Sequence, residues 1–397
     1  MKYVSGNFNF RNDILNIYPY ISHDLEIDTC IIGGSIAGLI TAYFLAKENK
    51  KVIIVEKNII GFGNSTCDTG ILDLDITKIA KIKKEDEVNK IITLYNDAKK
   101  DFITIAEEIG YNNITEMKKI VFTNKIMQKS NLQKYINVQN DYNIKCNLKE
   151  NDENIHSNLN VEFREKVLVI DTYEFTQKLA IYLTQKLNVD IYENTEIVSV
   201  NDSYEEVELL TNNEFYINAK KVIYCTGIDF LNEVDIDSAE VYQKSAVITK
   251  RNEGIQEKKK VYYNFNIEDM EVVINEDTTV KIADNSVKVN PKLQDEKYKD
   301  YIEKDKYTKL TIYLNKLLNN QEYAEADQCY SYLFLRTLDS LPFIDELECK
   351  NNCFCNISSE QNVVLSGIIG GKMLKNMVKG LFTKEMKFFK ITRGNCN

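Results

Sequence analysis

The sequence contains no tryptophan and only three prolines among its 397 residues, and this bias in composition carries no message about function. Long apolar runs are also missing, because no segment reaches the roughly 18–20 apolar residues that a membrane-spanning helix needs. The first residues, from Met1 to Arg11, lack the apolar core of a secretory signal peptide. We therefore expect no membrane span and a location in the cytoplasm.

An excess of positive charge is absent as well. The chain has 50 lysines and arginines against 60 aspartates and glutamates, which gives a net charge of −10. A chain with this balance repels the phosphates of nucleic acids. We therefore expect no nucleic-acid partner.

Histidine is scarce, and the cysteines form no recognisable metal pattern. The two histidines, His23 and His156, lie far along the sequence from a loose cluster of Cys349, Cys353 and Cys355. The spacing of this cluster matches no common zinc motif, and a zinc site needs about four ligands, so we predict no metal. The nine cysteines are scattered and odd in number. They are interpreted as reduced thiols rather than as a disulfide framework.

The length and the order of elements favour an α/β protein of two domains. Short apolar runs alternate with helical stretches, as in chains built on a mainly parallel sheet. The pattern predicts buried strands at Thr29–Ile32 and Val52–Val55 with a helix at Ser35–Lys47 between them. A long amphipathic helix is predicted over Glu85–Ile109. Antiparallel strands are expected between residues 240 and 282, where apolar and polar residues alternate.

Later elements follow from the same patterns. A second series opens with an apolar run at Val167–Ile170, and Asp171 is a plausible N-cap for the helix that follows. Near the C-terminus, Val363–Leu365 is predicted as a short strand. The last helix is expected to start near Gly371 and to run to Phe382.

A glycine-rich turn follows the first of these strands. Residues 29–38 read T-C-I-I-G-G-S-I-A-G, with Gly33 and Gly38 at the first and third glycine positions of G-x-G-x-x-G and Ser35 at the middle one. Gly33 would let the chain turn sharply out of the strand, and Gly38 would let the helix lie close to the sheet. The N–H groups at the positive end of this helix can hold a pyrophosphate, to which the Ser35 hydroxyl could donate a hydrogen bond.

An acid completes this pattern. Glu56 ends the second strand, 23 residues after Gly33, where a carboxylate binds the adenosine ribose hydroxyls. In the folded chain its carboxylate should lie at the turn formed by Gly33–Ser35. The strand, turn, helix, strand and acid together predict a dinucleotide site.

Three segments make the chain recognisable. They read D-T-C-I-I-G-G-S-I-A-G-L-I-T-A-Y-F-L-A from Asp28, V-I-I-V-E-K from Val52, and G-F-G-N-S-T-C-D-T-G-I-L from Gly61. In this order they resemble the FAD-dependent oxidoreductases of the D-amino-acid oxidase and glycine oxidase family. Further matches, in the order of the family, lie at 169–179, 192–200, 222–227, 336–345 and 363–374, so the resemblance covers nearly the whole chain.

The resemblance implies FAD as the cofactor and indicates which residues bind it. These candidates are Gly33, Gly34, Ser35, Ile36, Ala37, Gly38, Glu56, Lys57, Ser65, Thr66, Asp68, Thr69, Gly70, Ile197, Thr226, Gly227, Gly367, Ile369, Gly370, Gly371, Lys372 and Met373. Ile197 is expected in the strand that meets adenine. A turn at Gly367–Lys372 is expected to support the flavin ring at the start of the last helix.

The substrate side departs from the pattern of the family. Amino-acid oxidases of this type hold the substrate carboxylate with an arginine, but Phe334 falls at that position and Arg336 comes two residues later. Ser340 replaces a glycine, Ile368 a frequent histidine, and Asp68 a usual asparagine. No catalytic residue is assigned. The candidate substrate residues, each of which could instead serve packing or an ion pair, are Tyr262, Tyr263 and Arg336.

The predicted architecture is a Rossmann-type FAD-binding domain joined to a second α+β substrate domain on an antiparallel sheet. Residues 26–80, 165–235 and 325–397 would form the first domain, and residues 81–164 and 236–324 the second. The resemblance implies an oxidoreductase that transfers a hydride from a C–H bond next to an amine or hydroxyl of a small molecule to FAD. Two alternatives stay open. One is a family member that has lost turnover and serves as a flavin-binding or structural protein, and the other is an NAD-dependent dehydrogenase.

Overall fold

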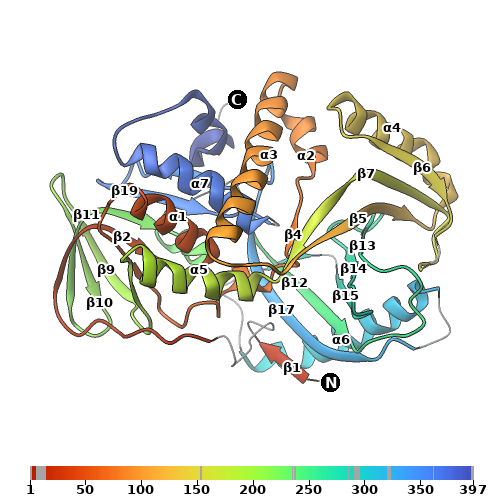
Figure 1. The fold of residues 1–397 in the computed structure, drawn as a ribbon, viewed down its shortest axis with the longest axis horizontal. Coiled ribbons are helices and arrows are strands. Elements are labelled where there is room, and N and C mark those ends of the chain that lie inside the picture. Colours follow the sequence, from red (N-terminus) through yellow and green to blue (C-terminus); the bar gives the residue numbers. More distant parts are fainter. Residues whose placement is uncertain are drawn as a thin grey trace.

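The computed structural model describes residues 2–5, 15–152, 154–234, 236, 238–284, 286–289, 296–319, 323–360 and 362–394. The described chain forms two sheets, with helices packed around them (Figure 1). The predicted α/β class, with a Rossmann-type unit and a second, mainly antiparallel sheet, is confirmed.

The first sheet has eight strands in the order β18-β19-β11-β2-β3-β8, with β10 attached to β11 and β9 attached to β10. Its strands are β2 (Leu25–Ile32), β3 (Val52–Val55), β8 (Asp190–Tyr192), β9 (Ile197–Asp202), β10 (Val207–Thr211), β11 (Tyr216–Tyr224), β18 (Phe343–Glu346) and β19 (Cys353–Ile357). The five strands from β19 to β8 are parallel. Parallel strands are buried on both faces, which explains why β3 consists only of Val and Ile, all buried.

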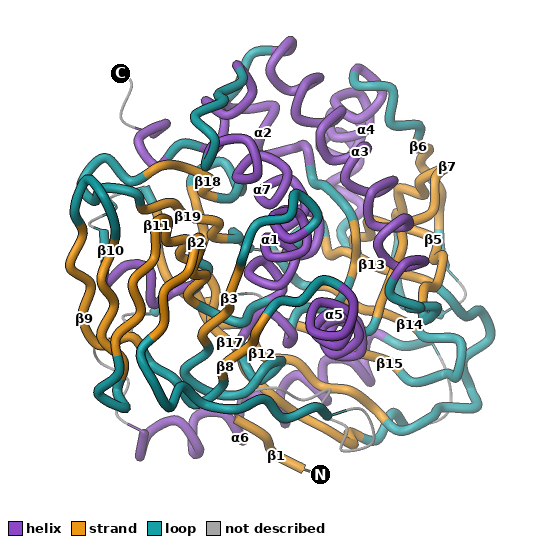
Figure 2. Tube along the Cα trace, turned by 60° about the vertical axis from the view of Figure 1, so that its left-hand side comes forward, coloured by secondary structure: helices purple, strands orange, loops and turns teal. Residues whose placement is uncertain are grey.

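Four helices share one hydrophobic core on one side of this sheet (Figure 2). They are α1 (Ile36–Ala46), α3 (Glu85–Glu108), α5 (Thr172–Lys186) and α7 (Val363–Met377). The predicted helices at 35–47 and 85–109 are confirmed within a residue of their ends. The predicted N-cap is confirmed too, because the Asp171 carboxylate accepts a hydrogen bond from the Glu174 amide at 2.9 Å.

The second sheet has 11 strands along the path β1-β17-β12-β15-β14-β13-β5-β7-β4, with β16 and β6 attached to β12 and β7. Its strands are β1 (Lys2–Ser5), β4 (Ile71–Leu72), β5 (Ile114–Thr123), β6 (Cys146–Glu150), β7 (Leu159–Ile170), β12 (Ala239–Thr249), β13 (Lys260–Asn264), β14 (Glu271–Ile274), β15 (Val280–Ala283), β16 (Val287–Lys288) and β17 (Ala326–Thr337). Helix α6 (Glu296–Leu317) packs on one face, against a core that includes Tyr262 and Val272. On the other face, Cys67 packs against Tyr330 and Tyr332.

Shorter elements complete the described chain. The helices are α2 (Ile76–Ile82) and α4 (Lys129–Asp141), and the 3-10 turns are η2 (Asn64–Cys67), η3 (Ile126–Gln128), η4 (Gly227–Asn232), η6 (Lys384–Phe389) and η7 (Ile391–Gly394). Turn η2 matters most for the site, because it runs between the N-terminus of α1 and the second sheet.

The prediction for the C-terminal segment is wrong about where the strand and the helix lie. Residues 363–365 form the first turn of α7 rather than a strand, and the strand that precedes this helix is β19. Val363 and Val364 are β-branched residues that favour strands. As the first turn of α7 they are buried in the core around α1, and this packing outweighs their strand propensity. The helix also ends at Met377 rather than at Phe382, and the Leu381 and Phe382 side chains beyond it are 57 % and 58 % exposed.

The domain boundaries stay a prediction. Assigned by sheet and core, β17 would belong to the second domain and α3 to the first, since α3 packs on α7. Eight cysteines lie in the described ranges as free thiols, seven of them buried, and Cys396 lies outside those ranges. The same ranges contain no group of three or more His, Cys, Asp or Glu side chains placed to hold a metal. None of the described helices combines the length and the apolarity needed to cross a membrane.

Candidate functional site

A cavity of about 490 Å³ lies at the carboxyl ends of β2, β3, β11 and β19. Its volume falls in the range of about 300–1,000 Å³ that is usual for ligand sites. Ligands of open α/β sheets bind at these strand ends. The opposite wall comes from the second sheet, where Tyr332–Leu335 of β17 line the cavity together with Asp68 after η2. The cavity therefore extends from the Rossmann-type turn to the second sheet.

The turn after β2 has the geometry that its glycines predict. Gly33 has a φ of 104°, in the region that favours glycine, and a Cβ there would lie 2.6 Å from the Cys225 carbonyl oxygen. A Cβ at Gly38 would lie 2.1 Å from the Gly33 carbonyl oxygen. Both glycines thus permit the close approach of α1 to the ends of β2 and β11, as predicted.

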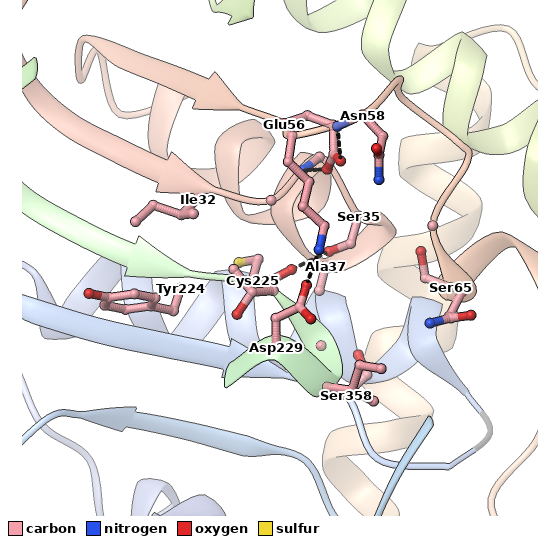
Figure 3. A pocket seen from close by; sticks show the side chains of 18 of the residues that line it. Ile32, Ser35, Ala37, Glu56, Asn58, Ser65, Tyr224, Cys225, Asp229 and Ser358 are labelled. Carbon is pink, nitrogen blue, oxygen red and sulfur yellow. Dashed lines mark hydrogen bonds and ion pairs between the residues drawn. The ribbon is translucent and has the colours of Figure 1, made fainter. Parts of the chain in front are cut away.

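The predicted position of Glu56 is confirmed. Its carboxylate accepts hydrogen bonds from the Gly34 amide at 2.8 Å and from the Asn58 amide at 2.9 Å. Figure 3 shows this carboxylate beside Asn58, near Ser35 at the start of α1. Burial raises the pKa of Glu56, and the two amides and Lys57 oppose this rise. The carboxylate is therefore fixed at the turn by backbone donors.

Ser35 has a different role from the expected one. Its hydroxyl donates to the Cys225 carbonyl at 3.0 Å and accepts from the Gly38 amide at 3.2 Å (Figure 3). The single hydroxyl proton is therefore already used, and Ser35 serves as the N-cap of α1 rather than as a free donor for phosphate. A glycine would lack this link between α1 and the end of β11.

The loop at 63–70 meets the N-terminus of α1 through Ser65. The Ser65 hydroxyl accepts a hydrogen bond from the Ile36 amide at 3.3 Å. Thr66 is buried, and its hydroxyl donates to the Gly61 carbonyl at 2.8 Å. A Cβ at Gly70 would lie 2.1 Å from the Ile170 carbonyl oxygen, so this glycine permits the pairing of β4 with β7. Ser65 and Asp68 line the cavity, whereas Thr66, Thr69 and Gly70 shape the loop behind them.

Three buried polar atoms in the cavity wall have no hydrogen-bond partner among the described residues. They are Thr226 Oγ1, Asn356 Oδ1 and Ser358 Oγ. Buried polar atoms are usually paired, so Thr226 Oγ1 and Ser358 Oγ are suited to a polar ligand that reaches them, whereas Asn356 Oδ1 lies against Gly370 of α7. They lie at the ends of β11 and β19, and the residues present thus fit a long dinucleotide such as FAD.

The predicted cofactor residues divide into two groups. The cavity is lined by Gly33, Gly34, Ser35, Ala37, Glu56, Lys57, Ser65, Asp68, Ile197, Thr226 and Gly227. Ile36 and Gly38 lie directly behind this wall in the first turn of α1. The prediction missed wall residues on β17 and after β19, chiefly Tyr332, Phe334, Asn356, Ser358 and Glu360. The apolar run Cys353–Ile357, followed by the polar run S-S-E-Q-N, was the available signal for a strand and turn there.

The glycine-rich segment near the C-terminus does not form the expected turn. Gly367, Ile369, Gly370, Gly371, Lys372 and Met373 lie within α7, and none of them lines the cavity. A Cβ at Gly371 would lie 2.7 Å from the Phe44 ring, and one at Gly370 would lie 2.2 Å from Asn356. Lys372 forms an exposed ion pair with Asp101 at 2.6 Å. These glycines therefore permit close packing of α7 against α1 and β19.

Replacing Gly370 with valine should lower the free energy of unfolding by about 1–3 kcal/mol, because an overpacked core costs about this much. Asn356, which the new side chain would displace, donates to Thr41 of α1 at 2.9 Å. Denaturant unfolding followed by circular dichroism measures the loss. Lys372→Val puts the same residue on an exposed position of the same helix and should change little. An equal loss in both variants would show that packing at Gly370 is not responsible.

The three candidate substrate residues do not line the cavity. Tyr262 lies in the core under α6, and its hydroxyl donates to Asp152 at 2.9 Å. Tyr263 points to the other face, where the Lys119 ammonium lies 5.5 Å from its ring centre. Arg336 forms ion pairs with Asp269 and Glu360, and its guanidinium stacks on Tyr242 at 4.0 Å. The ion-pair interpretation of Arg336 is thus the one that the geometry favours.

Solved structures with this fold cover nearly the whole chain. Glycine oxidase from Geobacillus kaustophilus matches with a TM-score of 0.76 and 16 % identity over 94 % of this chain and 99 % of that one. L-amino acid deaminase from Proteus vulgaris matches with a TM-score of 0.75 and 14 % identity over 95 % and 100 %. L-proline dehydrogenase from P. horikoshii matches with a TM-score of 0.71 and 17 % identity over 94 % and 98 %.

The sequence comparisons are consistent with this fold. No curated protein matches the sequence significantly. The family model described as FAD dependent oxidoreductase matches residues 28–377, which include the turn at Gly33, the whole of α7 and all strands of the two sheets except β1 and the start of β2. The chain therefore belongs to the D-amino-acid oxidase family of FAD-dependent oxidoreductases.

Proposed function

We propose that this protein binds FAD along the cavity and oxidises a C–H bond next to an amine, or a hydroxyl, of a small molecule. The observation that carries the proposal is the continuity of the cavity. One end is formed by the turn at Gly33 and by Glu56, and the other end by Asp68, Tyr332 and Ser358. This length suits a ligand with an adenosine at one end and a reactive ring at the other.

Each part of the wall suits one part of this cofactor. The Glu56 carboxylate would accept hydrogen bonds from the adenosine ribose, and Ile197 at the start of β9 would contact the adenine. The N-terminus of α1, next to Ser65, would hold the pyrophosphate. Thr226 and Ser358 would supply their unpaired atoms farther along the cavity. When bound, FAD supplies the hydride acceptor, and the protein positions the substrate against it.

The names of similar structures support an amine substrate. Glycine oxidase, L-amino acid deaminase and L-proline dehydrogenase are each named for an amino acid, whereas a glycerophosphate oxidase with the same fold is named for an alcohol. For this chain the amine class, a location in the cytoplasm and the absence of a nucleic-acid partner all belong to the proposal.

The visible spectrum of the purified protein tests the cofactor directly. We expect flavin absorption bands that are released on denaturation. Replacing Glu56 with alanine should weaken FAD binding about tenfold to a hundredfold, because hydrogen bonds to a charged group contribute about 1.5–3 kcal/mol. Glu48→Ala removes an acid just beyond the other end of α1, where Glu48 pairs with Lys379 at 2.7 Å, and it should leave FAD affinity unchanged.

The same experiment separates the alternatives. A protein that takes up no FAD, even when FAD is added, would support a structural role. Quenching of the tyrosine fluorescence of the protein by NAD, without FAD uptake, would support the NAD-dependent dehydrogenase. A protein that binds FAD, but whose flavin is not reduced by any amine or alcohol, would support the hypothesis that turnover has been lost.

A further inference from the structure

The end of the cavity at the second sheet is acidic. Its charged wall residues are Asp68 and Glu360, whereas the basic wall residue of the cavity, Lys57, is paired with Asp229 beside η4 at 2.7 Å. Asp68 is only 6 % exposed. Its carboxylate accepts one hydrogen bond from the Thr69 hydroxyl at 3.3 Å, and no lysine or arginine of the described residues forms an ion pair with it. A buried carboxylate without an ion pair favours a cationic ligand.

The positive charges around this end are held by other groups. Arg336 is paired with both Asp269 and Glu360. Lys244 forms a buried ion pair with Glu271 at 2.9 Å. Lys281 donates to the backbone carbonyl of Asp68 at 3.3 Å and lies behind the cavity wall. Glu360 also pairs with Lys78 at 3.3 Å, so its charge is compensated. A substrate carboxylate entering this end would therefore meet the Asp68 carboxylate and no positive side chain in the wall.

Two lysines behind the cavity wall act on the pKa of Asp68. Burial raises the pKa of Asp68, and Glu271 raises it further, whereas Lys281 and Lys244 lower it. The two lysines thus favour the ionised form of Asp68 from the side of the sheet, without reaching the ligand themselves. An ammonium group bound beside Asp68 would favour the ionised form further, because an opposite charge nearby stabilises a carboxylate.

Aromatic rings complete the wall on this side. Tyr332 and Phe334 of β17 both line the cavity, and their ring centres are 6.1 Å apart. The faces of aromatic rings attract cations, and quaternary and substituted ammonium ions are bound in this way. The net charge of −10 also attracts cations to the protein as a whole. A carboxylate beside two aromatic rings is a suitable site for a substituted ammonium ion.

We propose that the substrate is an amine without a carboxylate next to its nitrogen, and that the Asp68 carboxylate and the rings of Tyr332 and Phe334 hold its ammonium group. This inference rests on the proposed function, since it names the substrate class of the same site. It differs from amino-acid oxidation, in which a carboxylate must be bound as well. Asp68, which stands where the family usually has an asparagine, is then the residue that sets this preference.

The test uses the FAD-loaded protein and the change in its flavin spectrum on adding ligand. Tetramethylammonium and pivalate are probes of similar shape and opposite charge, and neither can be oxidised at an amine. We expect tetramethylammonium to bind at least about tenfold more tightly than pivalate, because placing like charges together costs several kcal/mol. Isobutylamine should likewise bind more tightly than L- or D-valine, which differ from it only by the carboxylate.

Variants identify the group responsible. Asp68→Asn should weaken tetramethylammonium binding about tenfold or more, because a charge-assisted contact is lost, and Asp68→Glu should restore part of it. Asp97→Asn removes an exposed acid of α3 and should leave the affinity unchanged. The comparison of tetramethylammonium with pivalate on the unmodified protein tests the proposal even if a variant does not fold.

The outcomes separate the two proposals. Failure to take up FAD would contradict the proposed function itself. Three outcomes in a protein that takes up FAD would overturn this inference and leave the proposed function standing. Pivalate or valine would bind as tightly as the matching cation, neither cation would change the flavin spectrum, or Asp68→Asn would bind tetramethylammonium with unchanged affinity.

Discussion

Replacing Lys244 with methionine should lower the free energy of unfolding by about 3–5 kcal/mol, because removing one partner of a buried ion pair is strongly destabilising. Lys244 on β12 and Glu271 on β14 lie on the same face of the second sheet, with their side chains 2 % and 1 % exposed and 2.9 Å apart. The variant thus removes the ammonium group that forms an ion pair with the buried Glu271 carboxylate. Denaturant unfolding measures the loss.

Two comparisons make this result specific. Lys250→Met breaks an ion pair with Glu325 that has the same distance of 2.9 Å but is exposed, and it should change stability little. The double variant Lys244→Met with Glu271→Leu should recover most of the loss, since apolar replacement of a buried pair is often neutral. A single variant as stable as the unmodified protein would contradict the burial of the pair.

The first half of the site could be predicted because its causes are local. The spacing of Gly33 and Gly38 and the cap at Asp171 depend on backbone geometry within a few residues, and the structure has each as predicted. Glu56 lies one strand away, at a position that the register of β2 with β3 fixes. Ser340 also has a φ of 60°, which is consistent with a position where the family has a glycine.

The second half could not be predicted because it depends on contacts between distant segments. Tyr332 and Phe334 line the cavity only because β17 crosses behind η2 in the folded chain. Arg336 has two ion-pair partners. Asp269 comes from a turn before β14, and Glu360 comes from the loop after β19. Neither partner can be recognised from the residues near Arg336.

The register error in α7 has a physical reason of the same kind. Glycines in a turn and glycines in a helix interface look alike in a sequence, since both permit a close approach of backbone. Here Gly367, Gly370 and Gly371 face α1 and β19. Only the neighbours of the helix show which of the two roles applies.

Replacing Gly38 with alanine should weaken FAD binding strongly, by up to about a hundredfold, because overpacking costs about 1–3 kcal/mol. The added Cβ would lie 2.1 Å from the Gly33 carbonyl oxygen, and backbone on both sides leaves little room to move. The first turn of α1 would shift away from the end of β2, and with it the amides of Ile36 and Ala37 next to the proposed pyrophosphate position. Titration of the apoprotein with FAD, followed by flavin fluorescence, measures the change.

Gly63→Ala is the matched control for this variant, because it adds the same methyl group at the same cavity where no protein atom lies within 4 Å. FAD affinity should fall much less there than in Gly38→Ala. Denaturant unfolding of both apoproteins separates a local effect from a loss of fold. A Gly38→Ala protein with normal stability and normal FAD affinity would mean that α1 can move without cost, and the pyrophosphate would then have to lie elsewhere in the cavity.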